Sequence, residues 1–205
     1  MKKNKGFTLV EMIVVVSIFA ILLGILTPSL NSILGFRVQR ATNSIAAALD
    51  QTKIEASGRL VGAMKLEKRS DGYYISYILD RGKVDGKDNI KINQDEEKIA
   101  PARTSITYYT DNSSEGKTIP ESGIVLTYDR ASGAFLPLMR TDNWENFDVL
   151  REVQNTNSYL QSMQLKIDGK VSYCSKIVVK GGSRIRTITL IQETGKYAIT
   201  AGETP

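Results

Sequence analysis

One segment near the N-terminus constrains the fold of this chain more than any other. From Phe7 to Leu34 the only charged residue is Glu11. Within it, Phe7–Leu26 supplies the ~20 largely apolar residues with which an α-helix crosses ~30 Å of hydrocarbon. The segment is apolar on all sides, which favours contact with lipid over a water-facing surface. Three lysines precede it, and they predict a cytoplasmic N-terminus with everything after Leu34 outside the cell.

Two ordinary explanations compete for this segment. A cleaved secretory signal usually has a shorter apolar run and ends at an Ala-x-Ala-like site, which is missing here. A plain signal-anchor has the same topology and stays open. Glu11 favours a more specific role, because a carboxylate near the centre of a bilayer costs about 2.5–3.5 kcal/mol and usually faces a partner. Snorkelling toward the headgroups is the alternative for Glu11.

The residues around Glu11 carry a family resemblance. The run Lys5-Gly6-Phe7-Thr8-Leu9-Val10-Glu11-Met12 resembles the type III signal of type IV pilins and type II secretion pseudopilins. In that family a membrane aspartyl peptidase cuts after the glycine and methylates the new N-terminal residue. The resemblance implies that Gly6 ends a leader of residues 1–6 and that Phe7 becomes N-methylphenylalanine. It also implies three kinds of partner: the prepilin peptidase, other pilin subunits and the pilus assembly platform.

Glu11 has a physical role in such an assembly. Moving an apolar helix from lipid into a bundle of like helices changes its burial little, so packing and polar pairing must drive association. After cleavage Phe7 carries a new ammonium one helical turn from Glu11. We hypothesise that Glu11 neutralises the N-terminus of a neighbouring subunit, which fixes axial register more than it adds stability.

The helix is predicted to continue well beyond the apolar segment. Gly24 and Pro28 interrupt residues 7–30, the membrane and filament-core part, and predict a kink or local melt. Pilins have a proline in this place, and Pro28 matches it. Residues 31–58 form an amphipathic second half that ends at Gly58. Its apolar stripe, expected to pack on a sheet, is Leu34, Val38, Ala41, Ile45, Ala48 or Leu49, Thr52 and Ala56.

Residues 59–205 read as a β-rich head, so the fold class is α+β, a long helix packed on antiparallel sheets as in pilins. The last 45 or so residues predict a meander, residues 80–104 a polar surface excursion, and Trp144–Val153 a short helix. The strands are expected at Val61–Lys68, Tyr73–Leu79, Ser105–Tyr109, Ile124–Tyr128, Ala134–Leu138, Leu160–Ile167, Val171–Lys180, Arg184–Ile191 and Lys196–Thr200.

The order of these elements resembles minor pilins and pseudopilins of the FimT and GspH type. Some DNA-uptake members of that group carry a Gly-Arg-x-Arg signature near the C-terminus. Here Gly195-Lys196-Tyr197-Ala198 keeps one cation and loses the other. Arg184 and Arg186, with Lys176 and Lys180 on the neighbouring strand, could form a basic ribbon for phosphates. The DNA-binding candidates are therefore Arg184, Arg186 and Lys196, and alternating exposed charge on a sheet is the simpler explanation.

Composition removes most enzymatic chemistry. The chain has no histidine and one cysteine, which excludes Ser-His-Asp and Cys-His catalysis and an internal disulfide. Cys174 is expected to be a buried small hydrophobe. Asp80, Asp85, Asp88 and Asn89 could gather oxygens for calcium, but their spacing matches no defined calcium loop. We predict no metal, no cofactor and no catalytic residue. The net charge of +5 owes much to the leader and is poor evidence for nucleic-acid binding.

These patterns predict a structural subunit, not an enzyme: a pilus or pseudopilus component held by one membrane span, with its head outside, and later part of a surface filament. The polar stretches at 80–104 and 140–158 favour a minor subunit, because they would complicate dense packing. Two alternatives remain: a minor pilin that binds DNA, and an anchored extracellular domain unrelated to filaments.

Overall fold

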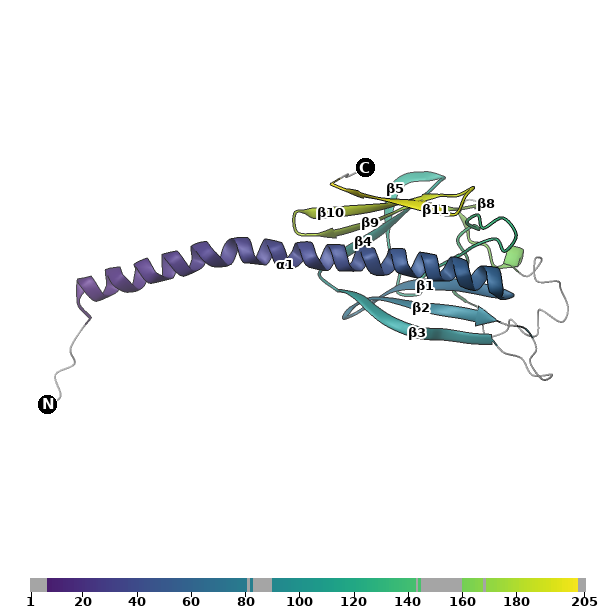
Figure 1. Ribbon diagram of the computed structural model, residues 1–205. Coiled ribbons are helices and arrows are strands. Elements are labelled where there is room, and N and C mark those ends of the chain that lie inside the picture. Colours follow the sequence, from purple (N-terminus) through teal and green to yellow (C-terminus); the bar gives the residue numbers. More distant parts are fainter. Residues whose placement is uncertain are drawn as a thin grey trace.

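The computed structural model describes residues 7–80, 82, 90–142, 144, 160–167 and 169–202, with the backbone alone for residues 25–33 and 90. One long helix, α1 (Leu9–Gly58), dominates the molecule, and a two-sheet head surrounds its C-terminal half (Figure 1). This arrangement confirms the predicted α+β class. The predicted leader, residues 1–6, lies outside the described residues.

Helix α1 is continuous across the position where a break was expected. The backbone stays helical through Gly24 and Pro28, and Figure 1 shows a gently curved helix rather than a sharp bend. The expected local melt is therefore wrong. A proline removes one backbone hydrogen bond, and the bonds on either side suffice to carry the helix through. The helix ends at Gly58, as predicted.

The head consists of two antiparallel sheets. The first has the order β3-β2-β1-β6, formed by β1 (Val61–Arg69), β2 (Gly72–Asp80), β3 (Ile90–Pro101) and β6 (Ile124–Thr127). The second has the order β11-β10-β9-β4-β5, formed by β4 (Ser105–Thr110), β5 (Ser113–Thr118), β9 (Cys174–Gly181), β10 (Arg184–Ile191) and β11 (Lys196–Ala201). A small hairpin joins β7 (Lys166–Ile167) to β8 (Lys170–Val171). Strands β9, β10 and β11 form the predicted meander.

The inner half of α1 lies between the two sheets and shares one core with both. The predicted stripe is buried from Val38 to Ala56, and its centre, Ile45 and Leu49, has no exposed surface. Leu66 from the first sheet and Ile177 from the second belong to the same cluster. The period of 3.6 residues therefore identified the buried face of the helix correctly.

A second, smaller core covers the other face of the first sheet. Val61 and Ala63 of β1 pack there against Met139, Trp144 and Met163. The indole Nε1 of Trp144 donates to the carbonyl of Arg140 at 2.8 Å, so Trp144 points inward as predicted. The rest of the helix expected at Trp144–Val153 lies outside the described residues.

Five strand assignments need correction. The expected strand Val171–Lys180 is divided between β8 and β9, and β5 was not expected. The expected surface excursion at 80–104 contains β3, which pairs with β2 through three register shifts and carries positive φ angles at Asn93 and Asp95. Ala134–Leu138 forms only an isolated bridge to Tyr128, and Leu160–Ile167 begins helical, with a strand only at its last two residues. Polar, bulged edge strands such as β3 lack the apolar alternation by which strands are recognised.

Candidate assembly segment

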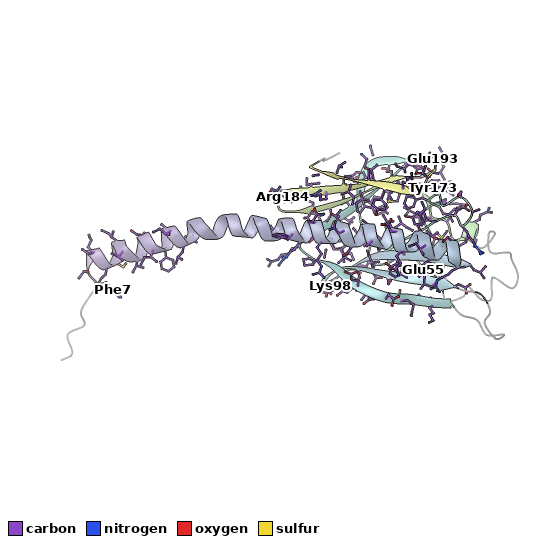
Figure 2. All side chains as sticks on the ribbon, viewed as in Figure 1. Phe7, Glu55, Lys98, Tyr173, Arg184 and Glu193 are labelled. Atoms are coloured by element: carbon purple, nitrogen blue, oxygen red, sulfur yellow. The ribbon has the colours of Figure 1, made fainter. Side chains whose placement is uncertain are left out.

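The outer half of α1 projects from the head as a bare apolar rod. Figure 2 shows this segment, with Phe7 at its far end, extending away from both sheets. Phe7 is 82% exposed and Phe19 61% exposed. A contiguous apolar surface of this kind marks a protein or membrane interaction site. In the part of the chain that the structure describes, no helix has the length and hydropathy needed to cross a membrane.

A capping box fixes the start of this helix. The Thr8 backbone N–H and hydroxyl both donate to Glu11 Oε2, each at 2.8 Å, and the Glu11 N–H donates to Thr8 Oγ1 at 3.3 Å. These reciprocal bonds satisfy donors that a helix N-terminus otherwise leaves unpaired. Glu11 therefore has a local partner in the single chain.

This box has two consequences for the role expected of Glu11. Its bonds join Thr8 and Glu11 only, so a cut between Gly6 and Phe7 removes none of these groups. Both bonds to the carboxylate end on Oε2, and a carboxylate offers about four acceptor positions. Glu11 therefore has capacity for a donor from a second chain while it still caps its own helix.

The other assembly residue proposed from the sequence, Pro28, lies in the backbone of α1 between the bare rod and the head. Its side chain is outside the description. Gly24, one turn earlier, has open space around the position of a Cβ atom. The predicted processing residue Gly6 is outside the described residues, whereas Phe7 and Glu11 are described.

The structure does not bring the three DNA-binding candidates together. Side chains alternate along a strand, so Arg184 and Arg186 share the helix-facing side of β10 with Ile188, which is fully buried. Lys196 pairs with Ile191, on the opposite side. Lys180 and Lys176 pair with Ile185 and Thr189, also on the opposite side. The expected single basic ribbon is therefore wrong.

The turn that contains Gly195 has a structural role. A Cβ at Gly195, where φ is +58°, would lie 1.9 Å from the Gly133 carbonyl oxygen, so only glycine fits. Lys53 Nζ of α1 donates to the carbonyls of Thr194 and Gly195 at 3.0 and 3.1 Å. The Tyr197 hydroxyl donates to Asp50 Oδ2 at 2.8 Å. These contacts tie the C-terminal turn to the inner half of the helix.

Among the described residues, neither the cysteine nor the acidic side chains form a reactive or metal-binding centre. Burial raises the pKa of the Cys174 thiol to about 12, which makes it inert, and the side chain is buried as predicted. No group of three or more acidic or sulfur ligands occurs in the described part of the chain. Asp80 Oδ1 accepts from the Gly82 N–H at 2.8 Å; the other calcium candidates, Asp85, Asp88 and Asn89, lie outside the described residues.

Comparison with known families bears on the N-terminal segment. Residues 1–27 match the family described as the prokaryotic N-terminal methylation motif. The chain is prepilin-like. The matched region includes the predicted leader, Phe7 and Glu11, and it is a motif of structural proteins rather than enzymes. No curated protein and no solved structure matches the chain.

Sequence reasoning missed one exposed feature of this prepilin-like chain. Phe36 lies at the point where α1 leaves the head, and 76% of it is exposed. It lies off the buried stripe, next to Arg37, and both side chains face solvent. An aromatic residue on the polar side of an amphipathic helix was the available signal.

Proposed function

We propose that this chain is a structural subunit, of the minor type, of a type IV pilus or pseudopilus. The observation that carries the proposal is the division of α1. One half is sealed in the head, and the other, next to the methylation motif, is a bare apolar rod. A rod of this kind buries its surface only against lipid or against like helices.

Before assembly, the rod anchors the prepilin in the membrane with its head outside. The apolar sequence of residues 7–26 and the lysines before it support this location. The prepilin peptidase cuts after Gly6 and methylates Phe7, and the assembly platform then moves the rod from lipid into the filament core.

Within the filament, Glu11 accepts the methylated ammonium of a neighbouring Phe7. The capping box supports this role because it holds the carboxylate one turn from the new N-terminus and leaves acceptor positions for a second chain. Two charges that leave water together gain little net stability. A mispaired subunit would leave both charges buried and unpaired, so the pair selects register.

The minor role is supported by the head surface. Strand β3 is a polar edge strand with three register shifts, and β5, the edge of the other sheet, has an almost wholly exposed side-chain set. Irregular, polar edges of this kind discourage the dense, repeated contacts of an abundant subunit.

The first experiment is the exact mass and N-terminal sequence of the chain from native cells, in membranes and in sheared filaments. A chain that begins at methylated Phe7 in both fractions, at a few per cent or less of the total pilin, is the expected result. An intact Met1 in cells with an active prepilin peptidase contradicts processing and favours an anchored domain unrelated to filaments. A processed chain that dominates the filament contradicts only the minor role.

A substitution at the cut site provides the matched control. Gly6→Val is expected to keep the leader attached and to exclude the chain from filaments, whereas Asn4→Val, two residues earlier, leaves both unchanged. Filament entry by the uncut Gly6→Val chain contradicts the proposed link between processing and assembly.

A further inference from the structure

We propose that the head docks on anionic phospholipid headgroups while the prepilin waits in the membrane, through a basic and aromatic surface at its base. This inference rests on the membrane residence in the proposed function. We call the surface the head base. It comprises Phe36, Arg37, Arg40, Arg103, Arg184 and Arg186.

The hairpin between β9 and β10 builds one side of the head base. Its turn lies directly on α1, since a Cβ at Gly181 would lie 2.8 Å from Val38 Cγ2 and one at Gly182 2.9 Å from Leu34 Cδ1. Glycine at both positions permits this close approach. The next strand then begins with Arg184, whose Cγ lies 3.6 Å from the Cβ position of Gly35. Figure 2 shows Arg184 where the helix leaves the head.

The helix and the first sheet supply the other sides. Phe36, Arg37 and Arg40 are exposed on α1, and successive helical residues lie about 100° apart, so they face different directions. Arg103 is exposed in the turn after β3. Glu97 of β3 accepts from the Ser44 hydroxyl at 3.3 Å, and it lines a surface hollow together with Phe36 and Arg40. Cations therefore surround the helix where it emerges.

The five arginines of the head base share a lack of acidic partners. Among the described residues, none of the five forms an ion pair with a carboxylate, nor does Arg130, whereas Arg59, Arg69 and Arg140 each pair with at least one. A cleft of about 480 Å³ lies between α1 and the hairpin, lined by Phe36, Arg184 and Arg186 among others. Unpaired guanidinium groups beside an open cleft suit a bidentate phosphate ligand.

The position of the head base along α1 matches the thickness of a membrane. At 1.5 Å per residue the helix rises about 40 Å from Leu9, its first residue, to Phe36. A bilayer measures about 40–45 Å with its headgroups included. When Phe7 lies at the inner surface, Phe36 and the arginines lie at the outer headgroups, where an aromatic ring and cations are both favourable. This match selects lipid phosphate over other anions as the ligand.

The test uses the full prepilin with Ser183→Cys, spin-labelled and inserted into vesicles. Ser183 lies at the tip of the hairpin, and the native Cys174 is buried and unreactive, so one site takes the label. Depth is measured by oxygen and nickel accessibility, in phosphatidylcholine alone and with about 30% phosphatidylglycerol. We expect the label at headgroup depth only when phosphatidylglycerol is present, and in water again at about 0.5 M salt.

Charge-removal variants test the residues. Arg184→Gln/Arg186→Gln is expected to weaken the docked state about 30-fold, since each cation near an anionic surface contributes about fivefold. Lys166→Gln/Lys170→Gln loses the same charge from the exposed β7–β8 hairpin and is expected to leave the depth unchanged. Equal effects of the two pairs overturn the proposal, because net charge alone would then explain them. The effect of salt on label depth is measured in the chain that keeps all its arginines. This measurement therefore does not depend on whether the arginine variants fold.

The remaining outcomes separate this inference from the proposed function. A chain that does not float with vesicles contradicts membrane residence and docking together. A chain that floats, with its label in water under every condition, contradicts docking alone. A short DNA duplex is added in parallel at low salt. Binding that Arg184→Gln/Arg186→Gln abolishes, with no lipid effect, reassigns the head base to DNA and overturns the proposal.

Discussion

The two halves of α1 have the same backbone conformation and opposite surroundings. From Val38 to Ala56 one stripe of the helix is sealed between two sheets, and Ile45 and Leu49 have no exposed surface. From Leu9 to Gly24 every described side chain is exposed. An α-helix satisfies its backbone hydrogen bonds internally, so a single helix tolerates both environments. One stretch of this helix therefore belongs to the core of the head, and a separate stretch carries the exposed apolar surface.

The largest expected difference between the two halves of α1 is in the effect of a Leu→Ala substitution on the free energy of unfolding of the head. Leu49→Ala should lower the free energy of unfolding of the head by about 2–5 kcal/mol, because a buried cavity forms. Leu22→Ala, half-exposed on the rod, should change it by less than about 0.5 kcal/mol. Near-ultraviolet circular dichroism of the full chain in mild detergent reports the head alone, since all nine tyrosines follow residue 72. Equal losses from the two variants contradict the separation.

Glu11 is expected to show the reverse pattern. Glu11→Gln keeps an acceptor for the Thr8 N–H and hence the capping box, but it removes the charge that would pair with a neighbouring Phe7 ammonium. We expect filament incorporation to fall about tenfold or more, as for a lost charge-assisted bond, with the head unchanged.

Thr8→Val is the matched control for Glu11→Gln. It removes the hydroxyl of the box and leaves the carboxylate charged, so we expect near-normal incorporation, measured as the ratio of filament to membrane chain on immunoblots. Loss with Thr8→Val but not with Glu11→Gln would assign Glu11 to helix capping and not to subunit pairing.

A smaller effect is expected where the C-terminal turn meets the buried half. Tyr197→Phe removes the hydroxyl that bonds Asp50 and should cost the head about 0.5–1.5 kcal/mol in chemical denaturation. Tyr109→Phe is the control, because among the described residues no hydrogen bond is recorded for its hydroxyl. A double-mutant cycle with Asp50→Ala isolates the pair, and zero coupling shows that this contact does not hold the helix.

The smallest expected effect is on pH dependence, and it is confined to the head. Hydrogen bonds from Ser132 and Ala131 hold the pKa of Asp129 below its usual range. A carboxyl whose pKa is lowered on folding stabilises the head above its unfolded pKa, and this contribution is lost as pH falls through the folded pKa. The free energy of unfolding should therefore fall between about pH 5 and pH 2. Asp129→Asn should make that fall shallower, and an unchanged slope contradicts the assignment.

Elements with a regular apolar pattern could be predicted from the sequence, whereas polar strands at the edge of a sheet could not. The buried stripe of α1, the end at Gly58 and the strands rich in β-branched residues all follow from local pattern. Strand β3 was missed because its polar residues are held by pairing with β2 across bulges, which no local alternation reveals. Phe7 and Glu11 are predicted from a linear motif, and their functional roles stay predictions. Lys196 does not lie with Arg184 and Arg186, the other DNA-binding candidates. The side of the sheet on which each residue lies is set by the pairing register of β10 with its neighbours, which the sequence alone does not reveal.

The capping box places the boundary of the helix on the mature side of the cut. Since Thr8 and Glu11 hold the start of α1 between them, the described part of the prepilin has the same first turn before and after cleavage. Cleavage would then change the charge at the N-terminus without changing the first turn of α1. Under the proposed function, the cut removes three lysines, Lys2, Lys3 and Lys5, and exposes one amine in their place. Under the proposed function, cleavage by the peptidase would be the step that allows the outer half of α1 to leave the membrane for the filament. The helix would not have to refold in between.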